Sequence, residues 1–315
     1  MHGPQRKRTL SGEGLQQTLI KSWHKYILYL SLVFLAAALY KADYLKLPHI
    51  FSVFTLVASF LLLFAGFILN AISWKQVLRK SNYAVRLDEC IAGFGLSIFG
   101  KYIPGKIWMV MGRAAYLAEK SQYSIGALSA VSLNAQFIAI WVGLVLGLIG
   151  IYLLGDGHLW SWLILAVWVV LTVVIFSPLV HAKAEQAMRR LLHKDVTIPR
   201  LTFRSTLSVM PWFVGYWVVW SCGFYFFVDS LTATFVPWSV GFGFPLAGTL
   251  GIMTFISPGG LGTREAVMAG YLTLAGIPLV EATTVAVASR LWFLTGEVFI
   301  FISGWIVHKR FQKAY

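Results

Sequence analysis

The 315-residue chain is too apolar and too sparsely charged to be a soluble domain. Apolar residues make up 58% of it and charged residues 12%, whereas roughly a quarter of the residues of a soluble domain are charged. The net charge of +14 would suit nucleic-acid binding, but the sequence contains no basic soluble domain to perform it. Composition therefore predicts an all-α integral membrane protein whose excess Lys and Arg lie on the cytoplasmic side.

The polar residues suggest neither a metal site nor an enzyme. Cys90 and Cys222, the two cysteines, adjoin or lie within apolar runs, and this spacing supports neither a disulfide framework nor a zinc site. The sequence also has no Ser-His-Asp, Cys-His or clustered-carboxylate arrangement typical of catalysis. We therefore expect no metal, no cofactor and no catalytic activity.

The chain begins with a basic tail and two apolar runs. Residues 1–25 carry five Lys or Arg against one Glu, which predicts a cytoplasmic tail. The first run, 26–40, is short, and its Ala36-Ala37-Ala38 resembles a signal-peptidase site, so a cleaved signal peptide is an alternative. The long tail favours a helix, although whether this helix spans fully stays open. Residues 47–74 form a second span that leads into a basic cytoplasmic segment.

A half-length apolar run follows. Residues 90–100 would give about 16 Å of helix at 1.5 Å per residue, which is half the thickness of the hydrocarbon core. The run ends at Pro104-Gly105, after which helical composition resumes as far as Lys120. This pattern predicts a re-entrant hairpin that returns to the cytoplasm, followed by a long outward span over 123–154.

The second half repeats this order. Residues 159–180 form an inward span to a basic loop, 183–204, in which 184–193 could form an amphipathic helix on the headgroups. Residues 205–228 then cross outward. Two half-length arms, 245–256 and 264–275, flank a second Pro-Gly break at Pro258-Gly259. The last span, 277–307, leads to a basic cytoplasmic tail, 308–315.

The two halves, 26–155 and 156–307, each contain a span, a span, a re-entrant hairpin and a span. An offset of 154 residues places Pro104-Gly105 on Pro258-Gly259. The first half starts in the cytoplasm and the second starts outside, so their topologies are inverted. We thus predict six spanning helices and two re-entrant hairpins in two inverted repeats, with both termini cytoplasmic and Asp156 and Asp229 outside. Such repeats are typical of transporters whose site lies at the membrane midplane.

The breaks supply a candidate substrate-binding site. Pro ends a helix, Gly allows close approach of the backbone, and the N-terminus of the next arm favours an anion. Four cations and two carboxylates lie near the breaks or within the last span, a net charge of +2, which suits a phosphate-bearing group better than a cation. The candidate site residues are Lys101, Tyr102, Pro104, Gly105, Lys106, Pro258, Gly259, Gly260, Gly262, Arg264, Glu265, Arg290 and Glu297.

Each charge also has a structural interpretation. Lys101 or Lys106 could snorkel to the cytoplasmic headgroups if the first hairpin is shallow. Arg290 and Glu297 lie seven residues apart, about two helical turns, and could form a purely structural ion pair or pair with Glu265 and Arg264.

The residues at the two breaks resemble a known family. Residues 101–108 (KYIPGKIW) and 258–265 (PGGLGTRE) resemble the two signatures of the lysylphosphatidylglycerol synthase transmembrane-region family. That family includes the flippase half of bacterial multiple peptide resistance factors and many stand-alone relatives. The resemblance extends over about 26–307. The family's soluble aminoacyl-transferase domain is missing from the sequence, so we expect no transfer of lysine to lipid.

The resemblance implies a bacterial or archaeal cell-membrane protein that moves an anionic or aminoacylated lipid, or a polyprenyl-phosphate-linked sugar, between leaflets. We therefore expect a lipid flippase whose partner is a lipid with an anionic headgroup. The main alternative is a non-transporting subunit of an envelope glycolipid or polysaccharide assembly complex, with loop 183–204 as the docking surface for partner enzymes. An enzyme acting on a lipid phosphate is the third class.

Overall fold

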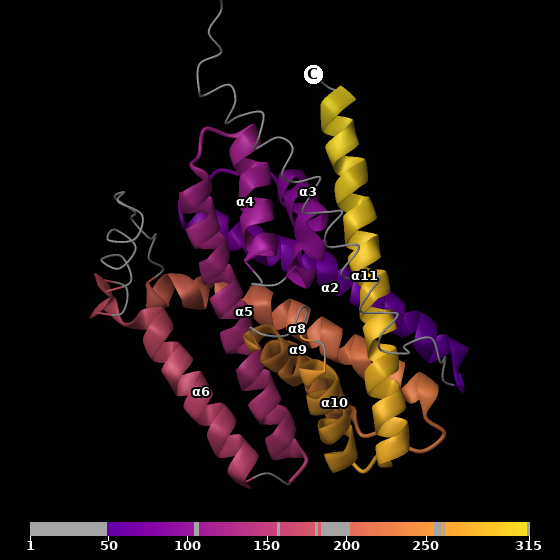
Figure 1. Ribbon diagram of the computed structural model, residues 1–315. Helices are drawn as coiled ribbons and strands as arrows, with labels where there is room; N and C mark the ends of the chain where they lie inside the picture. The colour runs from indigo at the N-terminus through magenta and orange to yellow at the C-terminus, as the bar shows by residue number, and fades with distance from the viewer. Residues whose placement is uncertain are drawn as a thin grey trace, which may run out of the picture.

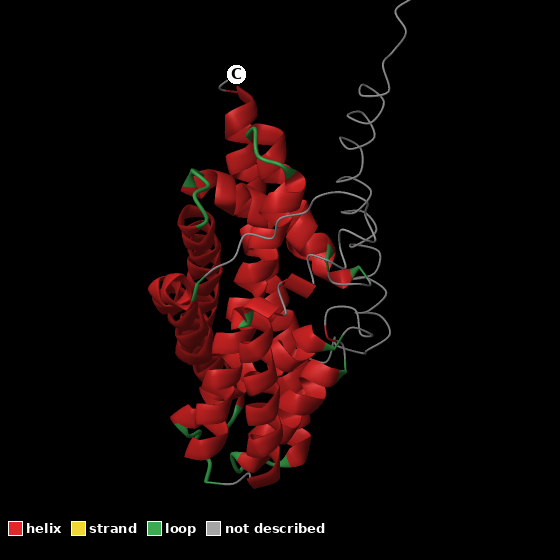
Figure 2. Cartoon of the chain, turned by 90° about the vertical axis from the view of Figure 1, so that its left-hand side faces the viewer, coloured by secondary structure: helices red, strands yellow, loops and turns green. Residues whose placement is uncertain are grey.

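The computed structural model describes residues 49–103, 107–155, 158–179, 182–183, 202–254, 260 and 262–313, and every regular element within them is helical (Figure 2). In chain order the elements are α2 (Val53–Lys80), α3 (Leu87–Ser97), η1 (Ile98–Tyr102), α4 (Trp108–Lys120), α5 (Ile125–Leu153), α6 (His158–Phe176), α8 (Phe203–Leu231), η2 (Trp238–Phe242), α9 (Gly243–Met253), α10 (Thr263–Leu274) and α11 (Leu279–Lys313).

Four described helices, α2, α5, α8 and α11, are long and apolar enough to cross a membrane. The chain is therefore an all-helical membrane protein. The expected span 159–180 corresponds to α6, whose apolar part, Ser161–Phe176, is shorter than these four. The expected first span, 26–40, and the amphipathic helix at 184–193 lie outside the described residues.

The helix boundaries differ most from the predicted ones at α2. We predicted a span over 47–74 that ends at a basic cytoplasmic segment, whereas α2 begins at Val53 and continues through this segment to Lys80. Lys and Arg are good helix formers, so charge alone does not end a helix. The helix ends where Asn82 adopts a positive φ of 63°. At its start, the Ser52 side chain accepts a hydrogen bond from the backbone N–H of Thr55, a normal N-cap.

Helices α2 and α8 form a long antiparallel pair that crosses the other helices obliquely (Figure 1). The backbone N–H of Phe51, before α2, donates to the carbonyl of Ser230, near the end of α8, at 2.8 Å. Farther along the pair, Trp220 donates through Nε1 to the carbonyl of Leu63 at 3.1 Å. The absence of a side chain at Gly66 makes room for the Trp220 ring.

The first hairpin, formed by α3, η1 and α4, packs α3 against the C-terminal half of α11. The crossing depends on small residues, because Gly95 lies against the backbone of Ile300 and also contacts Gly304. Close backbone approach through glycine is a usual way of packing helices in membranes, where no hydrophobic force draws them together.

The second hairpin, formed by α9 and α10, packs α9 antiparallel to α5. Gly150 lies beside Phe242, Gly147 beside Leu246 and Gly143 beside Thr249, so α9 rises from the end of α5 toward its middle. The two hairpins extend into the helix bundle from opposite ends of the molecule. In Figure 1, α3 and α4 lie at the end where α11 terminates, and α10 runs toward the other end.

We expect the Gly95→Ala variant to be destabilised. A Cβ at position 95 would lie 2.2 Å from the carbonyl oxygen of Ile300, so α3 or α11 must shift, at a cost of about 1–3 kcal/mol. Gly270→Ala is the matched control, because nothing lies within 4 Å of its Cβ position and alanine stabilises a helix by up to ~1 kcal/mol relative to glycine. Thermal unfolding of both variants in detergent should show shifts of opposite sign, and equal shifts would contradict this packing.

Candidate functional site

The middle of α11 carries the side chains on which both hairpins converge. Arg290, Phe293 and Glu297 are spaced three and four residues apart, so they lie along one face of the helix. All three are buried, and the Glu297 carboxylate is only 1% exposed. Charged groups at this depth are costly, so each is expected to have a partner or a function.

The tip of the first hairpin holds the Glu297 carboxylate. The Lys101 ammonium forms an ion pair with Oε1 of Glu297. The Tyr102 hydroxyl donates to Oε2 at 2.8 Å. Both partners lie at the end of η1, the short 3₁₀ turn that leads into the break. Lys101 is thus directed at the interior of the helix bundle.

The tip of the second hairpin contacts the same face of α11 one to two turns away. Glu265, in the first turn of α10, accepts a hydrogen bond through Oε2 from the backbone N–H of Gly262 at 2.8 Å. Its Oε1 lies 3.7 Å from Nη1 of Arg290. Arg290 therefore pairs with Glu265 while Glu297 pairs with Lys101, and each hairpin has its own ionic contact with α11.

Arg264 differs from these charges because its guanidinium has no carboxylate partner within the described residues. Its side chain begins in the first turn of α10 and is 6% exposed. The guanidinium carbon lies 4.7 Å from the ring centroid of Phe293 and 5.0 Å from that of Phe244. Its Nε and Nη2 are buried and make no hydrogen bond in the part of the chain that is described.

Such an arrangement favours an incoming anion. A buried cation that lacks acceptors costs several kcal/mol, and the aromatic rings return only about 2 kcal/mol or somewhat more. The N-terminus of α10 adds its own unpaired N–H groups and the positive end of the helix dipole. Arg264 thus begins in the first turn of α10, and its guanidinium extends along α9 to Phe244.

Two glycines give the second break its shape. Gly260 and Gly262 have φ values of 73° and 81°, in the region that residues with a side chain rarely adopt. A Cβ on Gly260 would also lie 2.8 Å from the carbonyl oxygen of Gly251, near the end of α9. The same stretch of α9 approaches Arg264, because a Cβ on Gly251 would lie 3.2 Å from the Arg264 Cβ. Glycine therefore lets the two arms meet beside Arg264.

The structure brings together Lys101, Tyr102, Arg264, Glu265, Arg290 and Glu297, with Gly260 and Gly262 at the second break. The remaining candidates, Pro104, Gly105, Lys106, Pro258 and Gly259, lie outside the described residues. The described cluster contains three cations against two carboxylates, a net charge of +1.

Sequence analysis missed three residues of the interior. Phe244 and Phe293 provide the ring faces for Arg264, and the spacing of Phe293 between Arg290 and Glu297 was the available signal. Arg113, on α4, is a further buried cation, 3% exposed, with its guanidinium 4.9 Å from the Trp74 ring. Its Nη2 donates to the carbonyl of Ser132 at 2.6 Å, a contact that ties α4 to α5.

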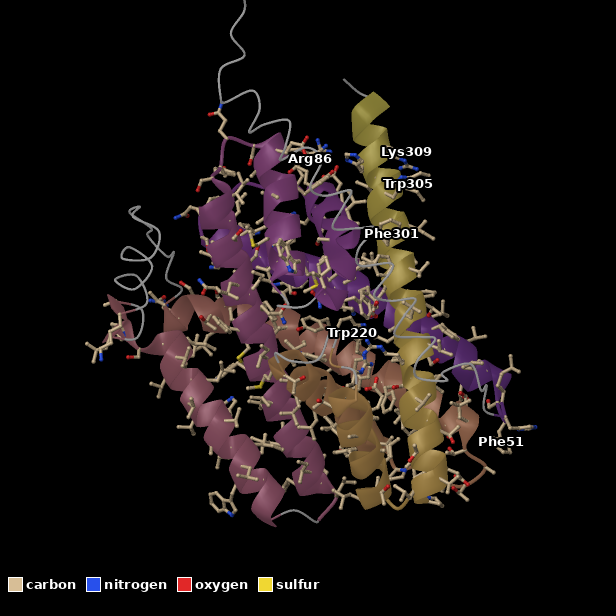
Figure 3. All side chains as sticks on the ribbon, viewed as in Figure 1. Phe51, Arg86, Trp220, Phe301, Trp305 and Lys309 are labelled. Atoms are coloured by element: carbon tan, nitrogen blue, oxygen red, sulfur yellow. The ribbon has the colours of Figure 1, made fainter. Side chains whose placement is uncertain are left out.

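Groups of three or more His, Cys, Asp or Glu side chains able to hold a metal ion do not occur in the described part of the chain. Trp220 lies near the middle of the molecule (Figure 3) and is surrounded by other aromatic side chains. Its ring contacts those of Phe67, Phe244 and Phe293 at centroid distances of 5.0, 6.0 and 5.3 Å. The charged cluster therefore lies against a wall of aromatic rings.

The sequence matches a known protein family over most of its length. Residues 23–300 match the family model described as the lysylphosphatidylglycerol synthase TM region. The chain belongs to this family. The matched region contains both breaks and every charged residue of the cluster, so the site lies within the part of the chain that defines the family. No curated protein matches the sequence.

Replacing Tyr102 with Phe tests the buried carboxylate. The variant removes a hydrogen bond to an ionised acceptor, which typically contributes about 1.5–3 kcal/mol. Tyr271→Phe is the control, because the Tyr271 hydroxyl donates at the same 2.8 Å to a neutral acceptor, the carbonyl of Ser239, where the contribution is about 0.5–1.5 kcal/mol. Thermal unfolding should show a larger loss of stability for Tyr102→Phe than for Tyr271→Phe. This difference should disappear when each variant also carries Glu297→Gln.

Proposed function

We propose that this protein moves a lipid with an anionic headgroup between the two leaflets, and that the lipid phosphate binds Arg264 at the N-terminus of α10. The observation that carries the proposal is the buried Arg264 guanidinium, whose Nε and Nη2 make no hydrogen bond among the described residues. A phosphate would supply acceptors to both nitrogens in the bidentate geometry that arginine favours. Its negative charge would also neutralise the net charge of +1 of the cluster.

The packing of the helices supports the inverted repeat that such a function needs. When α2 is exchanged for α8, α3 for α9, α4 for α10 and α5 for α11, the main contacts map onto one another. Helix α3 packs on α11 as α9 packs on α5, and α4 packs on α5 as α10 packs on α11. This correspondence supports our proposal that the halves 26–155 and 156–307 are two inverted repeats, with six spanning helices and two re-entrant hairpins.

This arrangement also suggests how the site changes sides. Each hairpin packs on the last helix of the opposite half, and the two tips meet on one face of α11. Displacing the first hairpin opens the cluster toward one leaflet, and displacing the second opens it toward the other. A phosphate on Arg264 competes with Glu265 and Glu297 for the other cations, so binding weakens the ionic contacts that hold the hairpins closed. The proposed movement involves no covalent chemistry.

The distribution of charge supports a cell-membrane orientation with both termini in the cytoplasm. Arg86 and Lys309 lie at the same end of the molecule (Figure 3), where Lys120 ends α4. The opposite end, at the start of α11, carries Glu281. Lys and Arg concentrate on the cytoplasmic side of membrane proteins, so the basic end faces the cytoplasm of a bacterial or archaeal cell.

The central test is a lipid-flip assay in proteoliposomes with Arg264→Gln. The loss of one charge-assisted contact of about 1.5–3 kcal/mol should slow the movement of an anionic phospholipid roughly 10- to 100-fold. The variant should keep its thermal stability or gain some, because it removes a buried cation without orphaning a paired carboxylate. Protein-free liposomes set the background rate.

The control for this test neutralises an ion pair completely. Arg290→Gln combined with Glu265→Gln removes both members of the contact between α10 and α11, so neither charge is left orphaned. This double variant should flip lipid faster than Arg264→Gln. Normal flipping by Arg264→Gln would overturn the site, whereas background flipping by the native protein would favour a non-transporting subunit of a lipid-assembly complex.

The orientation is tested by cysteine labelling in a variant that lacks Cys90 and Cys222. A cysteine at Glu281 should react with a membrane-impermeant maleimide added to intact cells, and a cysteine at Gln122 should react only after the cells are opened. Both positions are exposed in the structure. The reverse pattern would mean that the basic end faces outward.

A further inference from the structure

The ring of Phe293, on α11, contacts a cation from each of the two hairpins. Its centroid lies 4.8 Å from the ammonium nitrogen of Lys101, in the first hairpin, and 4.7 Å from the guanidinium carbon of Arg264, in the second. Because both distances are measured to one ring, the two cations are at most about 9.5 Å apart, which is the sum of the two distances. Of the rings that the structure describes, this one alone has a cation from both hairpins over it.

Three further aromatic rings hold Phe293 in place. Those of Phe67, Trp220 and Phe244 lie at centroid distances of 5.0, 5.3 and 5.4 Å from it. Phe293 itself is buried. A ring enclosed in this way cannot change its rotamer without displacing its neighbours, because protein interiors are close-packed. The position of the Phe293 ring is therefore fixed before any ligand arrives.

The ring contacts leave the hydrogen-bond donors of Arg264 unused. A cation over an aromatic ring is attracted by the negative face of the ring and needs no acceptor atom. The Nε and Nη2 groups, which form one edge of the guanidinium, make no hydrogen bond among the described residues. This edge suits two oxygens of one phosphate. The aromatic contacts thus hold the arginine and leave its phosphate-binding edge open.

Two carboxylates lie close enough to compete for the same arginine. Glu265 is the next residue of α10, and Glu297 lies one turn from Phe293 on the same face of α11. Both act electrostatically on Arg264. In the described part of the chain, however, Glu265 pairs with Arg290 and Glu297 with Lys101. An ion pair of either carboxylate with Arg264 would occupy the donors that a phosphate needs.

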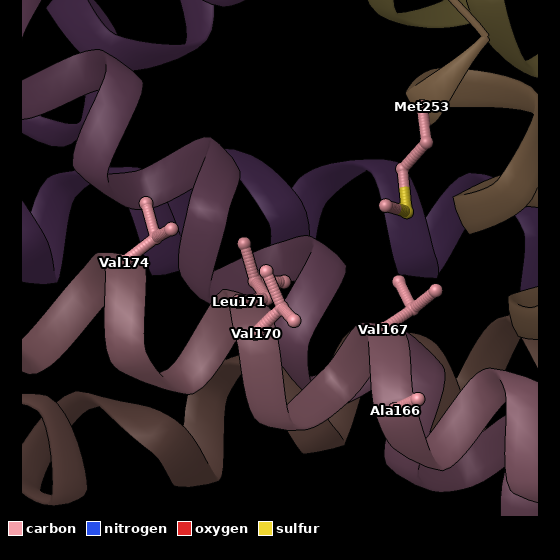
Figure 4. Close-up of a pocket in the computed structure, with 6 residues that line it drawn as sticks. All are labelled: Ala166, Val167, Val170, Leu171, Val174 and Met253. Carbon is pink, nitrogen blue, oxygen red and sulfur yellow. The ribbon is translucent and has the colours of Figure 1, made fainter.

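The apolar pocket between α6 and Met253 offers a phosphate no comparable group (Figure 4). Its lining consists of aliphatic side chains and this methionine, with neither a charge nor a hydrogen-bond donor. A phosphate placed there would lose its hydration without compensation. Of the two places, only the surroundings of Phe293 suit an anionic headgroup.

We propose that Phe293 is a positioning residue for the lipid phosphate, because its ring holds the Arg264 guanidinium away from Glu265 and Glu297 and keeps Nε and Nη2 free. The inference rests on the proposed function, since it concerns the arginine to which the phosphate is assigned. Preorganisation of this kind strengthens binding because no ion pair has to be broken first. The charge of Lys101, over the same ring, adds to the attraction for an anion.

The test replaces Phe293 with trifluorophenylalanine in the full-length chain. Fluorine withdraws electrons from the ring face and weakens its attraction for cations, but hardly changes the size of the side chain. Calorimetry on the detergent-solubilised protein then measures the Kd of dioctanoyl-phosphatidylglycerol, a short-chain anionic lipid. We expect the Kd to rise roughly 10-fold, through loss of a cation–π contact in a desolvated site. Should this variant fold poorly, Phe293→Leu also removes the ring face.

Phe227, on α8, is the matched control for the same replacement. It is buried, its ring stacks on that of Trp292 at 5.2 Å, and it also contacts Phe224. No cation lies over its ring among the described residues. Trifluorophenylalanine at this position should therefore leave the Kd unchanged.

Removing a competing carboxylate separates positioning from simple packing. In the variant that combines Glu265→Gln with Arg290→Gln, one of the two competitors of the phosphate is gone and no charge of that pair is orphaned. Fluorination of Phe293 in this variant should raise the Kd only about 3-fold instead of 10-fold, because Arg264 has lost one alternative partner. A ring that acts only through packing would give the same fold-change in both backgrounds.

An unchanged Kd after fluorination of Phe293, an equal change at Phe227, or the same fold-change in the double variant would overturn the inference. Absence of binding by the native protein would overturn both the inference and the phosphate site. Calorimetry measures binding and not transport, so the flip assay gives a separate result. A native protein that binds as expected but does not flip lipid would keep the role of Phe293 and refute the transport function.

Discussion

The Glu297 carboxylate, held by Lys101 and Tyr102, is the interaction on which the interior arrangement depends. A carboxylate that is 1% exposed in the middle of a spanning helix is stable only if its charge and its oxygens are satisfied. The partners come from η1, so α11 and the first hairpin cannot separate without leaving a buried charge unpaired. Lys101 and Tyr102, which precede the first break, lie at this depth because Glu297 is their partner there.

The second hairpin is also joined to α11 by an ion pair, but here the carboxylate belongs to the hairpin and the cation to α11. Glu265 pairs with Arg290 and accepts the N–H of Gly262, so the carboxylate fixes both the helix contact and the start of α10. Arg264, the neighbouring residue, is left with aromatic faces and unused donors. The asymmetry between the halves is clear on the last helices, because α11 carries Arg290 and Glu297 where the positions of α5 aligned by the offset of 154 residues are Gln136 and Gly143. Two similar hairpins thus share one charged helix and produce one site.

Much of this could be predicted from sequence because the signals were local. Uncharged runs predicted the spans, and Pro-Gly breaks flanked by charge predicted the hairpin tips at Lys101 and Arg264. The pairing could not be predicted, since which cation meets Glu297 depends on how the hairpins pack on α11. Arg113 was overlooked for a related reason. Its environment comes from Trp74 and Ser132, which are far from it in sequence. The end of α2 was placed too early because the apolar span ends at the first basic residues, although the helix continues through them to Lys80.

The net charge of the cluster determines how the proposed transport would respond to the membrane potential. Moving one charge across a membrane potential costs or yields about 2.3 kcal/mol per 100 mV. With three cations and two carboxylates, the empty cluster carries +1, and a singly charged lipid phosphate brings it to zero. In the proposed transport cycle the loaded site would then be electrically silent, and only the return of the empty site would respond to voltage. A lipid with one added positive group would leave the loaded site at +1, the same charge as the empty site, so the headgroup itself would decide whether the membrane potential drives the cycle.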